Sequence, residues 1–310
     1  MNVRSKYILI VLLSALIVAF ETVATEGALN TADLNLYLVS SLPSIVGGCI
    51  LMGIYPGDTK AFVRSLDRRG WSLTIVMCVL AAFGVVLWFD AVSRIGASKE
   101  AILGGGSSEV LFVVVLSALF LKEKLTRLEG FGSLLIILGV FLVLADLETL
   151  SFPTGIGEAE AIMSSVSLAG SIIIATALLR VYKLTPVSGV ELFLSGIMVV
   201  GFGIAFGLVS VPDAIGWAVL VLLGLFPAVG LLTYNAGLLK IGASLTSVLF
   251  ALTGIMTVGV QLLVLALYPD AEIILPRSVA IAVLGGIVAF MGVYLLHKNK
   301  AVRDTPEADG

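Results

Sequence analysis

The sequence predicts an all-α integral membrane protein with ten transmembrane helices, arranged as two inverted five-helix repeats. Composition and an internal repeat carry this prediction. Of the 310 residues, 59% are hydrophobic and 13% are charged, and the mean hydropathy is +1.14. A soluble core of this size cannot bury so much apolar surface, so lipid must be the solvent. The repeat is visible where residues 94–98, RIGAS, return as residues 240–244, KIGAS.

Apolar runs of about 20 residues indicate membrane-spanning helices, because lipid leaves no water to satisfy an exposed backbone. No stretch alternates with the period of two that is typical of an outer-membrane barrel. The predicted spans of the first half are residues 7–28, 34–55, 71–92, 98–121 and 128–145. Those of the second half are residues 158–182, 187–208, 214–239, 243–267 and 278–296.

The repeat divides the chain into two halves. Leu87-Trp88 corresponds to Thr233-Tyr234, and GVFL at 139–142 corresponds to GVYL at 292–295 after a short shift. Five is an odd number, so the second copy must enter the bilayer from the opposite side, as in the inverted repeats of secondary transporters. The expected division is a first repeat at 1–147, an external linker at 148–157, a second repeat at 158–300 and a polar cytoplasmic tail at 301–310.

The charge distribution predicts the orientation. With the N-terminus inside, only Arg94, Lys99 and Arg277 of the 18 Lys and Arg residues fall outside. Cytoplasmic loops are enriched in Lys and Arg, and one missed span would invert every later loop. We therefore expect a multi-pass protein of the plasma or inner cell membrane with both termini cytoplasmic. The net charge of −3 argues against binding nucleic acid or anionic lipid.

Several other functions are disfavoured by the residues. A signal peptide is an alternative for the first span, but the apolar length suits a span and the repeat needs a fifth helix. Cys49 and Cys78 are expected to be buried thiols in helix interfaces, and His297 is the one histidine in the chain. No phosphate-binding Gly-rich loop follows a strand. We expect no metal, no cofactor and no enzymatic activity.

Glu109 lies near the middle of the predicted fourth span. An ionised carboxylate at that depth costs about 2.5–3.5 kcal/mol even on insertion scales, so it must face protein or water. It is either a structural acid or a group that binds a proton or a solute. Glu21 in the first span leaves the same two alternatives open. Acids near the ends of spans are more often interfacial than ligands; these are Glu26, Asp90, Glu100, Glu158, Glu160 and Glu191. Lys99 could pair with Glu100 at the surface.

Five small residues, Gly104-Gly105-Gly106-Ser107-Ser108, stand just before Glu109. Small residues let another helix approach closely, and glycine weakens a helix locally. Both a packing contact and a thinned helix that borders a substrate fit this run. Pro43 and Pro227 inside the second and eighth spans remove backbone hydrogen bonds, and are expected to kink these helices where a gate could bend.

Trp88 and Tyr234 occupy equivalent positions in the two repeats. They are either aromatic residues of the membrane interface or two walls of one pocket. Asn235 and Gln261 are polar residues within spans, where they suit either a structural or a binding role.

Three segments of the first half carry a family resemblance: Ser108-Glu109-Val110, the stretch LKEKLT at 121–126, and the run from Gly132 to Gly139-Val140. Together with Ala97-Ser98 they resemble the drug/metabolite transporter superfamily in its EamA-type branch. In that family a Glu-Pro pair in the fourth helix precedes a Leu-Gly-Glu-Arg-Leu-Thr-like turn, and a Gly-Val pair closes the fifth helix.

In this resemblance Glu109 corresponds to the acid of the family and Glu123 to its turn glutamate. Val110 stands where proline is usual and Lys122 where glycine is usual, and in the second half Pro269 lies opposite Glu123. The resemblance implies a ten-helix transporter that moves metabolites, amino acids or drugs outward. It also implies a central cavity lined mainly by the first, third, fourth, sixth, eighth and ninth spans.

We therefore predict a secondary transporter that exports a small metabolite, amino acid or drug-like solute by alternating access, with Glu109 as the candidate for coupling to protons. The alternatives are a receptor or scaffold that transports nothing, and a channel, which would need a polar stripe through several spans. Expected partners are the solute, protons and the bilayer. Binding candidates are Glu109, Glu21, Ser107, Ser108, Trp88, Tyr234 and Asn235, and packing or gating candidates are Gly104, Gly105, Gly106, Pro43 and Pro227.

Overall fold

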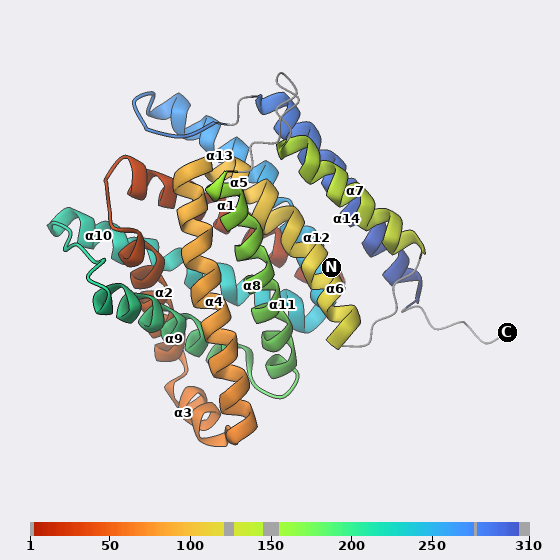
Figure 1. The fold of residues 1–310 in the computed structure, drawn as a ribbon. Coiled ribbons are helices and arrows are strands. Elements are labelled where there is room, and N and C mark those ends of the chain that lie inside the picture. The colour runs from red at the N-terminus through yellow and green to blue at the C-terminus, as the bar shows by residue number, and fades with distance from the viewer. Residues whose placement is uncertain (1–2, 121–126, 145–154, 276–277, 304–310) are drawn as a thin grey trace.

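The computed structural model describes residues 3–120, 127–144, 155–275 and 278–303, and every regular element in these ranges is a helix (Figure 1). The first half contains α1 (Val3–Asn30), α2 (Leu36–Ile54), α3 (Pro56–Ser65), α4 (Arg68–Ile95), α5 (Ala97–Ala101), η1 (Ile102–Ser108), α6 (Glu109–Phe120) and α7 (Arg127–Leu144). The second half contains α8 (Ile156–Leu179), α9 (Leu184–Ala205), α10 (Ala214–Leu223), α11 (Leu225–Ile241), α12 (Ala243–Phe250), α13 (Thr253–Leu267) and α14 (Val279–Arg303).

Each of the ten predicted spans coincides with one helix or with a consecutive set of helices, which confirms the all-α fold class. The fourth span consists of α5, η1 and α6, the eighth of α10 and α11, and the ninth of α12 and α13. Within the described residues, seven helical stretches are long and apolar enough to cross a bilayer, and the helices at 253–267 and 279–292 are shorter apolar ones. The protein is therefore a multi-pass membrane protein.

The helices pair in the pattern expected of two repeats related by a two-fold axis. The most extensive pairings are α7 with α14, α4 with α8, α2 with α9, and α1 with α11. In the order of the spans these pairs are 5 with 10, 3 with 6, 2 with 7, and 1 with 8. Exchanging the two halves converts the pair 3 with 6 into the pair 8 with 1, and returns the other two pairs to themselves.

Local backbone features recur at the same interval of 146 residues. Asp67 caps α4 by accepting a hydrogen bond from Gly70 N at 2.7 Å, and Asp213 caps α10 through Gly216 N at 2.7 Å. Gly96 and Gly242, the glycines of the RIGAS and KIGAS repeats, both have a φ of 83°. Side chains other than glycine rarely adopt this conformation, so the repeated glycine ends a helix in both halves.

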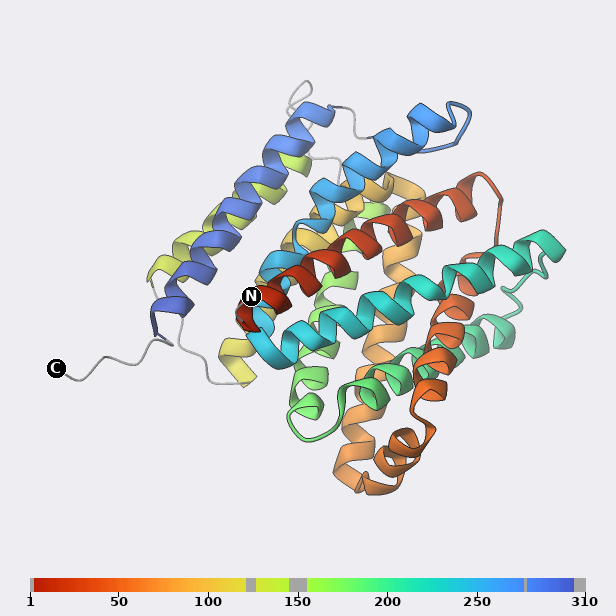
Figure 2. The same cartoon turned by 180° about the vertical axis from the view of Figure 1, so that it is seen from behind.

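Helices α7 and α14 lie side by side at the edge of the molecule and contact the other helices through η1, α12 and α13 (Figures 1 and 2). Their backbones approach closely where a Cβ atom on Gly139 would lie 2.5 Å from Gly285 O and 2.6 Å from Ala289 N. Small residues permit such contacts between membrane helices. This pair contributes no described residue to the cavity discussed below.

Three details differ from expectation. Residues 56–65 form the short helix α3, because Pro56 starts a helix without needing an N–H group and Asp58 stabilises the first turn. Cys78 is buried, but Cys49 is exposed on α2, so the expectation of two buried thiols is wrong for Cys49. Pro227 lies in the first turn of α11, so the eighth span breaks at Gly224. The fourth-span end at 121, the turn at 122–126, most of the linker and the end of the tail lie outside the described residues.

Candidate functional site

A cavity of about 170 Å³ lies at the centre of the bundle, between the two halves. Helices α1, α2, α4, α5, η1 and α6 line it from the first half, and α8, α9, α11, α12 and α13 line it from the second half. These include all six spans that the family resemblance implied, and the second and seventh spans add to them.

Four carboxyl groups line this cavity: Glu21, Glu100, Glu109 and Glu191. Each of the four residues is at most 7% exposed. No Lys, Arg or His is among the described residues that line the cavity. An ionised carboxylate attracts a positive charge strongly in surroundings of low dielectric constant. The cavity therefore favours protons or cations over anions.

Three of these carboxyl groups have a polar neighbour. Trp88 Nε1 donates a hydrogen bond to Glu100 Oε2 at 2.6 Å, and Ser171 Oγ donates one to Glu191 Oε1 at 3.0 Å. The hydroxyl of Tyr234 faces the Glu109 carboxyl group and lies 3.2 Å from Ser247 Oγ. The equivalent aromatic residues Trp88 and Tyr234 therefore both line the cavity, where each contacts an acid of the fourth span.

The irregular fourth span explains how Glu100 and Glu109 both reach the cavity. They are nine positions apart, which in a regular α-helix is roughly two and a half turns and places them on opposite faces. Residues 102–108 instead form the π-helix η1, and Glu109 N donates to Gly104 O, five residues earlier. A π-helix turns less per residue, so it rotates Glu109 toward the side of Glu100.

The small residues of η1 have different surroundings. A Cβ atom on Gly104 would overlap the carboxyl group of Glu100 and approach Ala161 O to 3.4 Å, whereas one on Gly105 would meet no atom within 4 Å. Gly105 lines the cavity. The sequence left two roles open for this run of small residues. Gly104 allows close packing, whereas Gly105 borders the cavity.

The other predicted site residues are placed as follows. Pro43 and Pro227 line the cavity. Ser108 is buried but is not among the lining residues, and Asn235 is buried where its Nδ2 donates to Ser188 Oγ at 2.9 Å. The side chains of Gly106 and Ser107 lie outside the described part of the chain.

Sequence reasoning missed Glu100, Glu191 and Ser171 as residues of the cavity. It assigned Glu100 and Glu191 to the membrane interface because of their positions near the ends of spans. For Glu100 a signal was present, because three consecutive glycines favour the irregular turn that brings it into the same space as Glu109. For Glu191 and Ser171 the pairing depends on how α8 packs against α9, which the sequence does not show.

Polar contacts join the two halves beyond one end of the cavity. Glu26 is fully buried, and its two carboxyl oxygens accept hydrogen bonds from Ile274 N and Gln261 Nε2, both at 2.7 Å. Glu26 lies one turn beyond Thr22, which lines the cavity. These bonds tie α1 to α13 and to the segment that follows α13.

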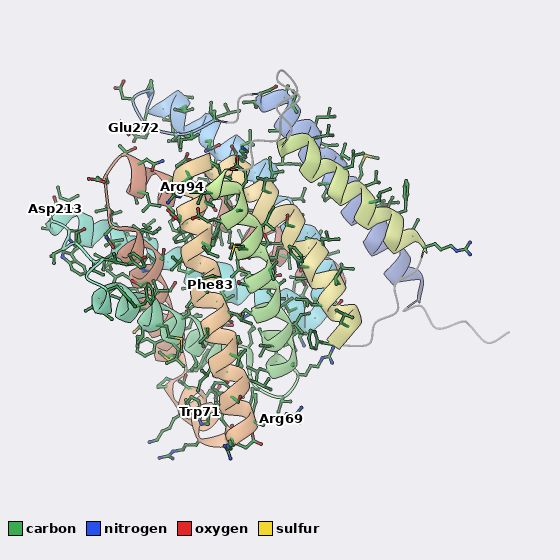
Figure 3. All side chains as sticks on the ribbon, viewed as in Figure 1. Arg69, Trp71, Phe83, Arg94, Asp213 and Glu272 are labelled. Carbon is green, nitrogen blue, oxygen red and sulfur yellow. The ribbon has the colours of Figure 1, made fainter. Side chains whose placement is uncertain are left out.

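A second set of contacts at this end joins α4 and α5 to α8. Lys99 Nζ lies 2.6 Å from Glu158 Oε1, so Lys99 pairs with Glu158 and the expected pair with Glu100 is wrong. Arg94 contacts Asp90 Oδ2 at 3.1 Å and Glu160 Oε2 at 3.2 Å. Figure 3 shows Arg94 and Glu272 toward one end of the molecule, whereas Arg69 and Trp71 lie at the opposite end.

Comparisons with known proteins agree with this architecture. The model of the EamA-like transporter family matches residues 5–145. A solved crystal structure aligns with a TM-score of 0.67 and 16% sequence identity, over 97% of this chain and 99% of that chain. At this identity the similarity demonstrates the fold alone. The search of curated proteins finds no match.

Proposed function

We propose that this chain, whose residues 5–145 match the EamA-like transporter family, is a secondary transporter that exports a small solute by alternating access. Members of this family are membrane transporters rather than enzymes. The solute would be a small metabolite, amino acid or drug-like molecule that binds in the central cavity, and the two halves would open it in turn to either side of the membrane.

The observation that carries the proposal is one cavity, lined by helices from both halves, in which four buried carboxyl groups meet. Buried ionisable groups are expensive in a membrane and commonly mark ion or substrate pathways. The contacts of Glu26 and Lys99 join the halves at one end of this cavity. Opening that end requires these contacts to break, which is the kind of change that alternating access needs.

We propose Glu109 as the position where protons couple to transport. The charged or titratable groups around it are Tyr234 from α11 and Glu100 from α5, and no basic side chain lines the cavity within the described residues. A proton bound to Glu109 removes a negative charge that Glu100 and any bound solute would sense. Proton binding and solute binding would thereby be linked.

The proposed orientation places the termini, Arg69 and α3 in the cytoplasm and Glu272 outside. Single cysteines at Ser65 and Ala32, both exposed, test it in a variant whose Cys49 and Cys78 are serine. In intact cells an impermeant maleimide should label Ala32→Cys and spare Ser65→Cys until the membrane is permeabilised. Labelling of Ser65→Cys in sealed cells would contradict the orientation.

A proteoliposome assay tests transport itself. Radiolabelled amino acids, organic amines and cationic dyes are supplied with and without an imposed pH gradient. We expect saturable, gradient-dependent flux of at least one solute class that empty liposomes lack, and its loss in Glu109→Gln. Glu272→Gln, the same change at an exposed outer position, is the matched control. Binding without flux would instead indicate a receptor, and flux that does not saturate would indicate a channel.

A further inference from the structure

Glu21 differs from the other carboxyl groups of the cavity in having no polar partner. Within the described residues, no hydrogen bond or ion pair reaches its carboxyl group. Its side chain lines the cavity and the residue is 7% exposed. The carboxyl oxygens of Glu21 have no partner, yet they are not fully buried. An unpartnered carboxyl group that borders free volume is placed to receive a donor from a ligand.

The walls around Glu21 suit an apolar body that carries a positive charge. Trp88, Phe89, Tyr234 and Phe250 are among the residues that line the cavity, and the faces of aromatic rings attract cations. The volume of about 170 Å³ is comparable to the engineered cavity of about 150 Å³ that binds benzene. In this conformation the cavity therefore accommodates a molecule built on roughly one ring.

Trp88 is held in place as part of this wall. Its indole N–H is bonded to Glu100 at 2.6 Å, and Glu100 is 1% exposed. A bond between an N–H group and a buried carboxylate restrains the orientation of the ring. Glu100, Glu109 and Glu191 each contact a polar side chain, and the second oxygen of Glu191 is buried without a partner. Glu21 is the one of the four whose carboxyl group has no partner within the described residues and still borders the cavity, so it is the group we assign to a ligand.

We propose that the cavity selects a monovalent organic cation with a ring-sized apolar body, whose ammonium group pairs with Glu21 and whose body packs against Trp88. This inference rests on the proposed function for its biological meaning, since it names the substrate class of the transport site. An anion would enter a space with four carboxyl groups and no basic side chain among the described lining residues. A zwitterion would bring a carboxylate into the same space and is disfavoured for the same reason.

Three probes with the same phenethyl body separate the charge classes: 2-phenylethylammonium, phenylalanine and 3-phenylpropanoate. Their binding to the purified full-length protein in lipid nanodiscs is measured by calorimetry at pH 7, with no gradient. We expect the cation to bind at least about tenfold more tightly than the zwitterion, and the anion to show no binding. A tenfold ratio corresponds to about 1.4 kcal/mol.

Substitution of Glu21 tests the residue assignment. Glu21→Gln should weaken 2-phenylethylammonium binding at least about tenfold, which corresponds to about 1.4 kcal/mol, while Glu272→Gln leaves it unchanged. Glu21→Asp keeps the charge and should retain the preference for the cation. If Glu21→Gln does not fold, the aspartate variant and the three probes on the unsubstituted protein still decide the question.

Equal binding of the three probes, tighter binding of the zwitterion or anion, or full affinity in Glu21→Gln would overturn the inference. Because binding is measured without transport, the two proposals fail separately. Cation binding without flux would refute transport and leave the cation site standing. Flux that is confined to anions or zwitterions would refute the cation site and leave transport standing.

Discussion

The fourth and ninth spans occupy equivalent places in the two halves, and both are interrupted near the middle. In the fourth span the interruption is the π-helix η1, and in the ninth it is the turn at Ala251-Leu252 between α12 and α13. At the repeat interval of 146 residues, Gly105 corresponds to Ala251. Irregular helices in corresponding positions of two repeats commonly border the binding site of a transporter, and residues of both spans line the cavity here.

The two spans differ in chemistry although they share this irregularity. Glu100 corresponds to Thr246, and Glu109 corresponds to Ile255. The first half supplies three of the four cavity carboxyl groups, and Glu191 is the contribution of the second half. The helix pairings therefore follow a two-fold pattern, while the carboxyl groups lie mainly in the first half. We infer that the duplicated frame provides the motion and that the first half provides most of the binding chemistry.

The largest difference between the equivalent spans is expected when leucine replaces Gly105 in one variant and Ala251 in another. Gly105→Leu places about four carbon atoms in the cavity, so transport should fall to the background of empty liposomes while the melting temperature changes little. Ala251 packs against the buried cluster of Val110 and Val114, so Ala251→Leu should overpack this contact at a cost of about 1–3 kcal/mol. Thermal unfolding in detergent and solute uptake measure the two effects. Loss of stability in Gly105→Leu with transport retained would contradict the assignment.

A smaller difference, in stability alone, is expected when alanine replaces each of the two repeated glycines. The positive φ of 83° at Gly96 and Gly242 should cost each variant about 1–3 kcal/mol. Gly96→Ala should be the more destabilised variant, because its Cβ would overlap the carbonyl oxygen of Ile274, whereas no atom lies within 4 Å of the corresponding position at Gly242. Equal melting temperatures of the two variants would show that the contact with Ile274 is not maintained in the protein.

The smallest difference between equivalent positions of the two halves is expected for the aromatic pair Trp88 and Tyr234. Trp88→Phe removes the donor to Glu100 and leaves a buried carboxyl group unsatisfied, at a cost of about 1–3 kcal/mol. Tyr234→Phe removes a hydroxyl that contacts the buried Glu109 carboxyl group and Ser247, also at a cost of about 1–3 kcal/mol. Trp88→Phe should be somewhat more destabilised, because it also removes ring atoms from a packed site. Chemical or thermal unfolding of both variants measures the difference. A greater loss in Tyr234→Phe would place the more important polar contact in the second half.

The sequence was sufficient to predict the membrane environment, the helical spans and the repeat, because these depend on composition, on the length of apolar runs and on charge. It also indicated Glu109, Glu21, Trp88 and Tyr234, which the structure brings to one cavity. It did not indicate Glu100 or Glu191, since the face on which a helical residue lies changes with local winding and with packing. The π-helix η1 rotates Glu109 toward the side of Glu100, and the spacing of hydrophobic residues does not predict this rotation.

The most direct test of the asymmetry compares net transport with exchange in Glu109→Gln. Proteoliposomes loaded with unlabelled solute at equal pH report exchange, which needs binding and alternation but no net proton movement. Proteoliposomes with a pH gradient report net, proton-driven flux. We predict that Glu109→Gln retains exchange and loses gradient-driven flux, while Ile255→Val at the equivalent position of the second half retains both. Unchanged gradient-driven flux with the same pH dependence in Glu109→Gln would contradict the account and assign Glu109 a structural role.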